Sequence, residues 1–255
     1  MREIRPIREE EAPAYLELLC EVFGLDYNRA EPIFFTEPLF DLNRKWALFE
    51  GREMVSIMTT VPLQFGDFRA VGIAGVATRE ARRQEGFAGA LMKKVLDVSA
   101  RNGETASLLF ARQPELYARL GFAPLDDVIQ GPLLSTRNLT HFPIELGALQ
   151  NLYDGWAAAD RMRLRRDEQR WTYWRWVYRD AYAVDGGYAC LENGQCREVI
   201  RTPGTPLSLG AGIEWFGLKS MADKLDLPLV SRLKTMSLMG RGIDVCPEMF
   251  LSDQF

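Results

Sequence analysis

The order of structural elements between residues 68 and 122 constrains the fold of this chain more than any other feature. Residues 68–78 (FRAVGIAGVAT) are small and apolar, as in a buried strand, and they end abruptly in a charged, glycine-containing run at 79–86. An amphipathic helix follows and stops at Asn102-Gly103, and residues 105–110 form a second apolar strand before a brief helix. Two strands joined by one helix are expected to lie parallel in one sheet. The sequence therefore predicts a βαβα unit of a mixed α/β fold.

The residues before this unit predict a helix and a hairpin. Residues 9–23 place their apolar side chains on one helical face, and Gly24 follows as a stop. Residues 27–40 contain two prolines and are expected to form a loop or a short helix. Two strand-like runs at 46–49 and 54–61 flank a polar turn, so we expect them to pair.

The second half of the chain carries weaker patterns. No long element is expected between Pro124 and about residue 150, and residues 151–180 are helical and aromatic. Asn193-Gly194 lies between two strand-like runs, which is the strongest short-range signal of a hairpin. A last helix is expected around 215–225.

Two clusters in this half have a structural and a functional interpretation. The run 161–170 (RMRLRRDEQR) is mixed in sign and is expected to be the solvated face of a helix. The aromatic residues from 171 to 178 are interpreted as core or as a domain contact, in preference to the lining of a substrate cavity.

Charge and composition exclude several classes of function. The net charge of −4 and the pI near 5.3 provide no basic field for nucleic acid. No apolar run approaches the roughly 18 to 20 residues that span a bilayer. The first residues lack the apolar centre of a secretory signal, so a cytoplasmic location is expected. Neither a nucleic acid nor a membrane is an expected partner.

The cysteines and the only histidine argue against metal chemistry. The four cysteines show no CxxC spacing and are interpreted as buried or half-exposed thiols. A single histidine, His141, rules out multi-histidine metal sites, and any Ser-His-Asp mechanism would have to use it. It lies in a polar, proline-flanked segment and is expected on the surface, so no metal is expected.

The segment before the central helix has the composition of an anion-binding loop. Gly86, Ala88 and Gly89 lack bulk, so a pyrophosphate can approach backbone N–H groups at the helix N-terminus. Arg82 and Arg83 add positive charge nearby. The alternative is an ordinary solvated turn that is rich in arginine. The loop lacks both the Lys-Ser/Thr pair of a Walker motif and the GxGxxG spacing of a dinucleotide site.

These residues resemble the GNAT superfamily of N-acetyltransferases. Arg83-x-x-Gly86-x-Ala88 is similar to its (Q/R)xxGx(G/A) signature, and the strand at 75–78 is similar to its fourth strand. Residues 116–122 (LYARLGF) resemble its second signature, which follows the fifth strand. The resemblance implies a GNAT fold over about 1–125 and acetyl-CoA as co-substrate, bound by the strand backbone and the loop. The implied binding residues are Val76, Ala77, Thr78, Arg83, Gln84, Glu85, Gly86, Phe87, Ala88 and Gly89.

Within the superfamily, the chain resembles the enhanced-intracellular-survival branch. The resemblance rests on LLF at 108–110 together with YARLGF at 117–122, on the aromatic helical segment that follows, and on a sequence that ends in Phe255. It implies Tyr117 as general acid and the terminal carboxylate of Phe255 as general base. The chain is shorter than the three domains of that branch. The region after 150 therefore cannot hold both a second full GNAT domain and a sterol-carrier-like domain.

Tyr117 also has an interpretation that is independent of the resemblance. An amine that attacks a thioester needs the leaving thiolate to be protonated, and a tyrosine hydroxyl near the sulfur can donate that proton. The alternative is a packing role, because the neighbouring Leu116 and Leu120 are expected to face the core. Both interpretations stay open at this point.

Taken together, these features predict a GNAT domain at 1–145 and a smaller α+β domain at 150–255. The second domain is either a reduced second GNAT-like domain or a cover for the acceptor site. The expected activity is that of an N-acetyltransferase, an acyltransferase that acts directly on a primary amine, because neither motif contains a cysteine nucleophile. A small-molecule acceptor is favoured, since no second recognition module is visible.

Two alternatives remain: a non-catalytic acyl-CoA-binding regulator and a protein-directed acetyltransferase. The identity of the acceptor and the oligomeric state, a homo-oligomer included, do not follow from the sequence.

Overall fold

A computed structural model describes the chain except for residues 1, 135–141, 178–179, 203, 206 and 208, so His141 lies outside the described residues. Close packing divides the chain into two compact units. The first contains the residues up to 63, together with 68–109 and Phe255, and the second contains 64–67 and 110–254. The domain division at 1–145 and 150–255 remains a prediction. No helix among the described residues is both long and apolar enough to cross a membrane.

The sheet of the first unit combines antiparallel and parallel pairing. Strands β1, β2 and β3 are paired antiparallel, and β4 and β5 are parallel, as the βαβ pattern predicts. The strands follow one another in chain order across the sheet. Their bounds are Arg2–Pro6 (β1), Lys45–Glu50 (β2), Glu53–Phe65 (β3), Arg69–Thr78 (β4) and Ala106–Ala111 (β5).

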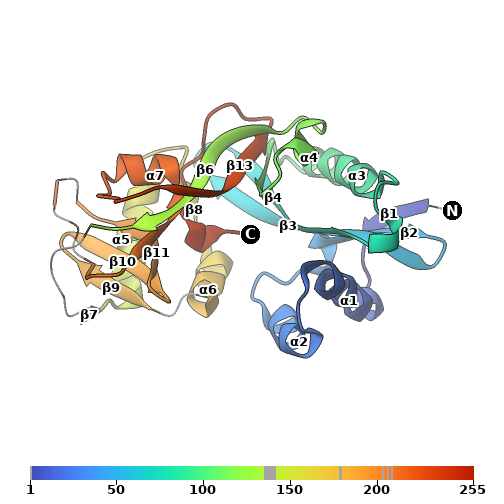
Figure 1. Cartoon of the computed structure of the whole chain (residues 1–255), viewed down its shortest axis with the longest axis horizontal. Coiled ribbons are helices and arrows are strands. Elements are labelled where there is room, and N and C mark those ends of the chain that lie inside the picture. Colours follow the sequence, from blue (N-terminus) through green and yellow to red (C-terminus); the bar gives the residue numbers. More distant parts are fainter. Residues whose placement is uncertain (1, 135–141, 178–179, 203, 206, 208) are drawn as a thin grey trace. The chain divides into compact units, whose positions relative to one another are not determined.

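Helices cover both faces of this sheet. Figure 1 shows α1 and α2 on one side of the strands and α3 on the other. The predicted helix that stops at Gly24 is confirmed, because α1 ends there and Gly24 takes the left-handed conformation at φ 65°. The side chain of Asp26 caps α2 by accepting a hydrogen bond from the backbone N–H of Arg29 at 2.9 Å. The helices are α1 (Ala12–Phe23), α2 (Tyr27–Thr36) and α3 (Phe87–Arg101), with single 3-10 turns at Glu9–Glu11, Leu42–Arg44 and Glu80–Arg82.

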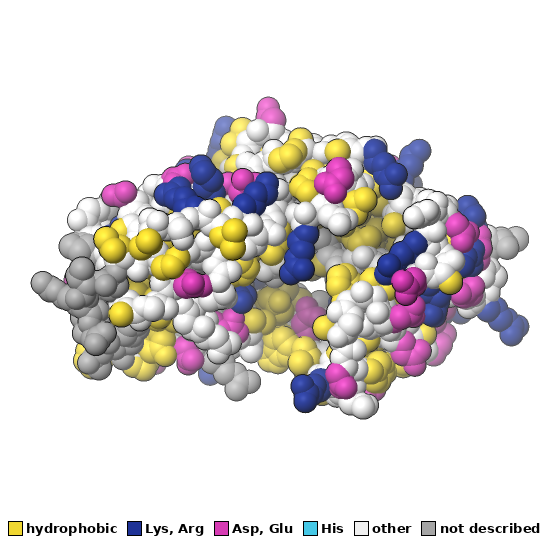
Figure 2. Space-filling model, viewed as in Figure 1, with side chains coloured by type: hydrophobic (Ala, Val, Ile, Leu, Met, Phe, Trp, Pro, Cys, Tyr) yellow, Lys and Arg dark blue, Asp and Glu magenta, His cyan; other side chains and the backbone are white. Residues whose placement is uncertain are grey.

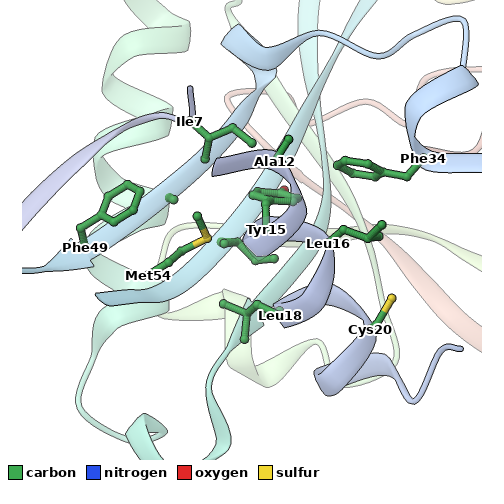
Figure 3. Close-up of a cluster of buried hydrophobic side chains, with 12 residues drawn as sticks. Ile7, Ala12, Tyr15, Leu16, Leu18, Cys20, Phe34, Phe49 and Met54 are labelled. Carbon is green, nitrogen blue, oxygen red and sulfur yellow. The ribbon is translucent and has the colours of Figure 1, made fainter. Parts of the chain in front are cut away.

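The core beneath α1 anchors this helix to the strands. Tyr15, Leu16 and Leu18 are fully buried and meet side chains of α2, β2 and β3 in one cluster (Figure 3). Each such side chain contributes roughly 1.5–3 kcal/mol by leaving water. The buried hydroxyl of Tyr15 shares a hydrogen bond of 2.9 Å with the hydroxyl of Thr59, so its burial leaves no polar group without a partner.

The second unit contains its own mixed sheet. In this sheet β11 and β12 are parallel and the other described pairings are antiparallel. The order is β13-β6-β12-β11-β10-β9-β7, and β8 pairs with the end of β3. The strands are β6 (Ala123–Pro132), β7 (Phe142–Pro143), β8 (Leu164–Arg165), β9 (Ala181–Val184), β10 (Gly187–Glu192), β11 (Gln195–Ile200), β12 (Glu214–Leu218) and β13 (Leu233–Arg241). The helices are α4 (Glu115–Ala118), α5 (Leu146–Ala158), α6 (Glu168–Val177), α7 (Lys219–Lys224) and the 3-10 turn η4 (Leu251–Asp253).

The mixed α/β class, with a mixed sheet flanked by helices, is confirmed. The predicted hairpin is confirmed as well: β10 and β11 pair antiparallel around Asn193 and Gly194, whose φ angles of 49° and 79° suit a tight two-residue turn.

One prediction for the second half is wrong, and another is correct only in part. The ten-residue strand β6 occupies the stretch after Pro124 where no long element was expected. Asp126 and Asp127 make this strand hard to predict from the sequence, because acidic residues are unusual in strands. Here they bond to distant groups, namely the backbone N–H of Ser220 and the hydroxyl of Ser237. The helix expected around 215–225 begins only at α7, because Trp215 is buried in strand β12.

The run 161–170 is also not a solvated helix face. It contains β8 and the start of α6, and its central residue Arg166 has a side chain that is 0% exposed. The sequence shows only the alternation of charges along the run. The carboxylates that pair with Arg166 lie elsewhere in the chain.

Candidate active site

The pairing between strands β4 and β5 ends about halfway along β4. Their parallel register runs from Ala70 opposite Ala106 to Ile73 opposite Leu109, and it ends there although β4 continues to Thr78. Gly75 lies just beyond this point with φ at 57°, a left-handed conformation that interrupts a regular strand and that glycine adopts without strain. The backbone after Ile73 has therefore left the register with β5.

The three predicted strand residues differ in their surroundings. Val76 is half-buried, whereas Ala77 is buried and its carbonyl accepts a hydrogen bond from the hydroxyl of Ser56 at 3.0 Å. The same hydroxyl shares a hydrogen bond of 2.9 Å with that of Thr78. Ser56 of β3 thus holds the end of β4 in place on the side away from β5.

The loop after β4 presents an open helix terminus. Arg83, Gln84, Glu85 and Gly86 are exposed, and Gln84 and Gly86 both take positive φ angles, of 68° and 80°. Gly86 is the N-cap of α3, and a Cβ atom at this position would meet no atom within 4 Å. The first backbone N–H groups of a helix have no partner within the helix, so this terminus can receive an anion.

The two neighbouring arginines of the loop are not equivalent. Arg82 is held by Glu50, Glu53 and Glu85, with Nε of Arg82 2.8 Å from Oε1 of Glu85. Hydrogen bonds from Arg82 lower the pKa of both Glu50 and Glu85, so these carboxylates stay ionised beside it. The side chain of Arg83 is 50% exposed, with Glu80 3.9 Å away. Arg83 is therefore the cation of this pair that remains available to a ligand.

Such pairing of opposite charges extends beyond the loop. Figure 2 shows basic and acidic side chains close together on the visible surface, and Arg5 pairs with Glu11 at 2.6 Å.

Phe87, Ala88 and Gly89 form the first turn of α3. The ring of Phe87 is buried, with the guanidinium carbon of Arg2 4.8 Å and that of Arg82 4.9 Å from its centroid. Its side chain therefore packs at the start of the helix, against Arg2 and against Arg82 of the loop. Ala88 and Gly89 are half-buried, and a Cβ atom at Gly89 would meet nothing within 4 Å.

Tyr117 lies in α4, a single helical turn of the second unit. Its ring meets the edge of Phe122 with centroids 6.3 Å apart, and burial raises the pKa of its hydroxyl above the usual 10. Among the residues the structure describes, none forms a hydrogen bond with this hydroxyl. Leu116 is 48% exposed, so the expectation that it faces the core is wrong, because one turn buries only part of its surface.

Phe255 reaches the first unit at the paired half of β4. Its ring lies against Gly72, where a Cβ atom would be 2.7 Å from ring carbons Cγ and Cδ2. The first unit thus contains β4, the loop and Phe255, whereas Tyr117 belongs to the second unit.

A groove between α1 and α2 was not found from the sequence. It has a volume of about 610 Å³, which is within the usual range for small-molecule sites. Leu19 lines it and also lies over β4, with Cδ1 3.2 Å from the position of a Cβ atom at Gly75. The signal in the sequence that could have indicated this groove was the presence of apolar residues such as Ile33 in the segment that forms α2. The structure leaves Ile33 exposed. The lining residues are Leu16, Leu19, Gly24, Leu25, Asp26, Arg29, Ala30, Ile33, Phe34 and Glu37.

Metal ligands do not gather anywhere in the described ranges: no three His, Cys, Asp or Glu side chains there are close enough to hold an ion. The four cysteines are free thiols, three buried and Cys246 half-buried.

The geometry of β4, the loop and α3 agrees with a family match. A family model described as an acetyltransferase (GNAT) domain matches residues 3–125. These residues, just under half of the chain, are thus similar to a GNAT acetyltransferase domain.

Solved structures of similar fold extend over nearly the whole chain. A GCN5-related N-acetyltransferase from Kribbella flavida superposes with a TM-score of 0.71 at 17% identity, covering 94% of this chain and 71% of that one. A second from Anabaena variabilis gives 0.69 at 16% identity, covering 96% and 74%. Eis1 from Mycobacterium abscessus gives 0.66 at 14% identity, covering 93% and 73%. No curated protein sequence matches the chain.

Proposed function

We propose that this protein transfers the acetyl group of acetyl-CoA directly to a primary amine of a small molecule. The observation that carries the proposal is the end of the β4–β5 register at Ile73, beside an open helix terminus at Gly86. A strand that leaves its neighbour provides backbone for an extended arm, and the helix terminus provides N–H groups for a pyrophosphate.

The proposed binding residues divide this work between strand and loop. Val76, Ala77 and Thr78 would hold the pantetheine arm through their backbone. Arg83 would add charge at the pyrophosphate, where the exposed backbone of residues 84–89 supplies donors. The three glutamates that pair with Arg82 direct their carboxylates at its guanidinium, so these negative charges are compensated and repel the ligand less.

In the proposed reaction, the amine nitrogen attacks the thioester carbonyl carbon. A C–N bond forms, the C–S bond breaks, and Tyr117 donates its phenolic proton to the departing thiolate. The carboxylate of Phe255 takes up the proton that the amine loses. Burial raises the pKa of Tyr117, so the phenol carries its proton at neutral pH.

The state of the cysteines supports direct transfer. Burial raises the pKa of Cys196 and of Cys246 to about 12 and also raises that of Cys20 and Cys190, so these sulfurs stay protonated near pH 7. A thiol in that state is a poor nucleophile. An acetyl-cysteine intermediate is therefore not part of the proposed route.

The groove between α1 and α2 is the proposed acceptor site. Its apolar walls suit a hydrophobic body, while Asp26 and Glu37 suit a cationic amine. Leu19 connects this groove to Gly75, at the stretch of β4 where the acyl arm would lie.

The test is release of free CoA thiol from acetyl-CoA with a panel of primary amines, some with aromatic or long alkyl bodies and some fully polar. We expect acceleration with the apolar amines. Binding of acetyl-CoA without release for any amine or peptide would indicate a non-catalytic regulator. Release with a peptide mixture and with no small amine would indicate a protein-directed enzyme.

A further inference from the structure

A hydroxyl group of β3 lies beside the stretch of β4 that has left β5. A Cβ atom at Gly75 would be 3.8 Å from Oγ1 of Thr59 and 3.2 Å from Cδ1 of Leu19. Thr59 is half-buried, and Leu19 also lines the groove between α1 and α2. The missing side chain of Gly75 therefore leaves space between a hydroxyl group and a residue of the groove wall.

The hydroxyl of Thr59 has one partner among the residues that the structure describes. It shares a hydrogen bond of 2.9 Å with the hydroxyl of Tyr15, which extends from α1 into the buried cluster of Figure 3. Each hydroxyl group carries one hydrogen and two lone pairs, so the distance alone allows either group to donate.

Burial decides the direction of this hydrogen bond. Tyr15 is fully buried, and its hydroxyl bonds to no other group within the described part of the chain. If Tyr15 accepted the bond, its own hydrogen would be left without a partner, at a cost of about 1–3 kcal/mol. Burial also raises the pKa of Tyr15, so the phenol keeps this hydrogen. Tyr15 therefore donates to Thr59, and the hydrogen of Thr59 points elsewhere.

The neighbouring cation on this face of the sheet is already engaged. Lys45 lies directly opposite Thr59 in the pairing of β2 with β3, and its side chain is 5% exposed. Its Nζ atom lies 5.0 Å from the ring centroid of Phe34 and 3.9 Å from Oε2 of Glu37. The ring and the carboxylate both stabilise the ammonium group where it is. Thr59 rather than Lys45 is therefore the donor that a ligand beside Gly75 would meet.

The proposed function places the acyl end of the cofactor beside Gly75. The pyrophosphate would lie at the loop before α3, and the pantetheine arm would extend from there along residues 78 to 76. The far end of the arm then reaches Gly75, just before Ile73, where the pairing with β5 begins. An acyl oxygen there needs to lie only about 1 Å closer to Oγ1 of Thr59 than the Cβ position does to accept a hydrogen bond.

We propose that the hydroxyl of Thr59 donates a hydrogen bond to the carbonyl oxygen of the acetyl thioester, and that Tyr15 is the positioning residue of Thr59. This inference rests on the proposed function. The carbonyl oxygen gains negative charge when the C–N bond forms, and it becomes a carbonyl again when the C–S bond breaks. A donor aimed at this oxygen stabilises the transition state more than the bound substrate. The hydrogen bond from Tyr15 polarises the hydroxyl of Thr59 and makes it a stronger donor.

The contact is tested first without an acceptor, by infrared spectroscopy of bound acetyl-CoA that is isotopically labelled at the thioester carbonyl carbon. A hydrogen bond to the oxygen weakens the C=O bond. The carbonyl band should therefore lie at a higher wavenumber in Thr59→Val than in the unaltered protein. An unchanged band in Thr59→Val would overturn the proposal, as would a failure of the unaltered protein to bind acetyl-CoA.

Thr60→Val is the matched control for this measurement. Thr60 is the next residue of β3, so its side chain faces the other side of the sheet, where its hydroxyl donates to the carbonyl of Arg44 at 3.3 Å. The carbonyl band of bound acetyl-CoA should be the same in Thr60→Val as in the unaltered protein. A shift as large as that of Thr59→Val would show that the band responds to any change in β3, and it would also overturn the proposal.

Turnover is the second measurement, with an amine that the unaltered protein acetylates. Thr59→Val should lower kcat about a hundredfold, which is a typical cost of losing one donor to an oxyanion, while KM for the amine changes less than threefold. Thr59→Ser keeps the hydroxyl and should retain most of the turnover. A higher KM for the amine with an unchanged kcat would overturn the proposal and make Thr59 a contact of the acceptor.

Tyr15→Phe tests the positioning role, because it keeps the buried ring and removes the hydroxyl. It should lower kcat about tenfold in the unaltered protein and cause no further loss in Thr59→Val. Equal losses in the two backgrounds would show that Tyr15 acts through packing, which would overturn its positioning role.

The infrared measurement separates this proposal from the proposed function. If no amine is acetylated but the band shifts in Thr59→Val, the transfer reaction fails and the contact with the carbonyl oxygen is confirmed. If Thr59→Val does not fold, Thr59→Ala and Thr59→Ser are compared in its place, and the band should lie at a higher wavenumber in Thr59→Ala. Identical bands in these two variants would overturn the proposal.

Discussion

The ring of Phe255 lies so close to Gly72 that a methyl group on Gly72 would be 2.7 Å from two of the ring carbons. Gly72 belongs to the half of β4 that pairs with β5, where it lies opposite Leu108. The absence of a side chain at Gly72 is thus what allows Phe255 to approach the strand. This relationship can be tested with little risk to the cofactor site, which begins beyond Ile73.

Gly72→Ala should displace Phe255 and lower turnover at least tenfold. The added methyl group cannot share the space of the ring, and Phe255 can move more easily than a central strand. The dissociation constant for CoA, measured by calorimetric titration, should change less than threefold. Near wild-type turnover in a folded Gly72→Ala protein would contradict a role for Phe255 in catalysis.

Gly155→Ala is a control of the same chemical size and should stabilise the protein by about 0.5–1 kcal/mol. Gly155 lies inside α5, and a Cβ atom there would meet nothing within 4 Å. Alanine loses less backbone entropy than glycine on entering a helix. Denaturant unfolding measures the change. A lower free energy of unfolding in Gly155→Ala would contradict the open space around a Cβ atom at Gly155.

Gly86→Asp should weaken CoA binding at least tenfold more than Gly86→Asn, which corresponds to about 1.4 kcal/mol. Both residues tolerate the left-handed conformation that Gly86 adopts, so the strain is similar in the two variants. Only the aspartate places a negative charge where the pyrophosphate is proposed to bind. Equal affinities of the two variants for CoA in calorimetric titration would contradict the assignment of this loop to the CoA-binding site.

Arg83→Gln should weaken CoA binding about five- to tenfold, whereas Arg82→Gln should change it less than threefold. The charge of Arg82 is already neutralised by three glutamates, while that of Arg83 is largely free. The dependence of CoA affinity on salt concentration should also become shallower in Arg83→Gln alone. If Arg82→Gln weakened CoA binding more than Arg83→Gln does, then Arg82 and not Arg83 would be the residue that binds the ligand.

Tyr117→Phe should lower turnover about a hundredfold and leave CoA affinity unchanged, because it removes one oxygen and keeps the ring. Burial raises the pKa of Tyr117, so the donor stays protonated at neutral and mildly alkaline pH. Between pH 8 and 10, the turnover of the unaltered protein should therefore change with pH in the same way as the turnover of Tyr117→Phe. Near wild-type turnover of the variant would make Tyr117 a packing residue.

The contrast between α1 and β6 explains which elements could be predicted. In α1, helical periodicity and a terminal glycine specify the element within a dozen residues. In β6, the stabilising pairs are made with β12 and β13, about a hundred residues further along the chain. A short window of sequence contains no trace of these partners, and Asp126 and Asp127 argue against a strand until their own partners are known.

The sequence by itself determined the features that depend on neighbouring residues. These are the βαβ order, the stop at Gly24, the turn at Asn193-Gly194 and the loop that precedes α3. Each follows from backbone preferences or from the periodicity of apolar side chains, which act over a few residues.

Only the tertiary structure decided which charges are used and which are free. Arg166 looks like any other charge in its run, but Glu198 and Asp253 bury it, and Arg82 differs from Arg83 only because Glu50 and Glu53 of neighbouring strands reach it. Phe255 meets Gly72 for the same reason. An ion pair or a close approach depends on where folding brings distant segments, and local preferences carry no information about that.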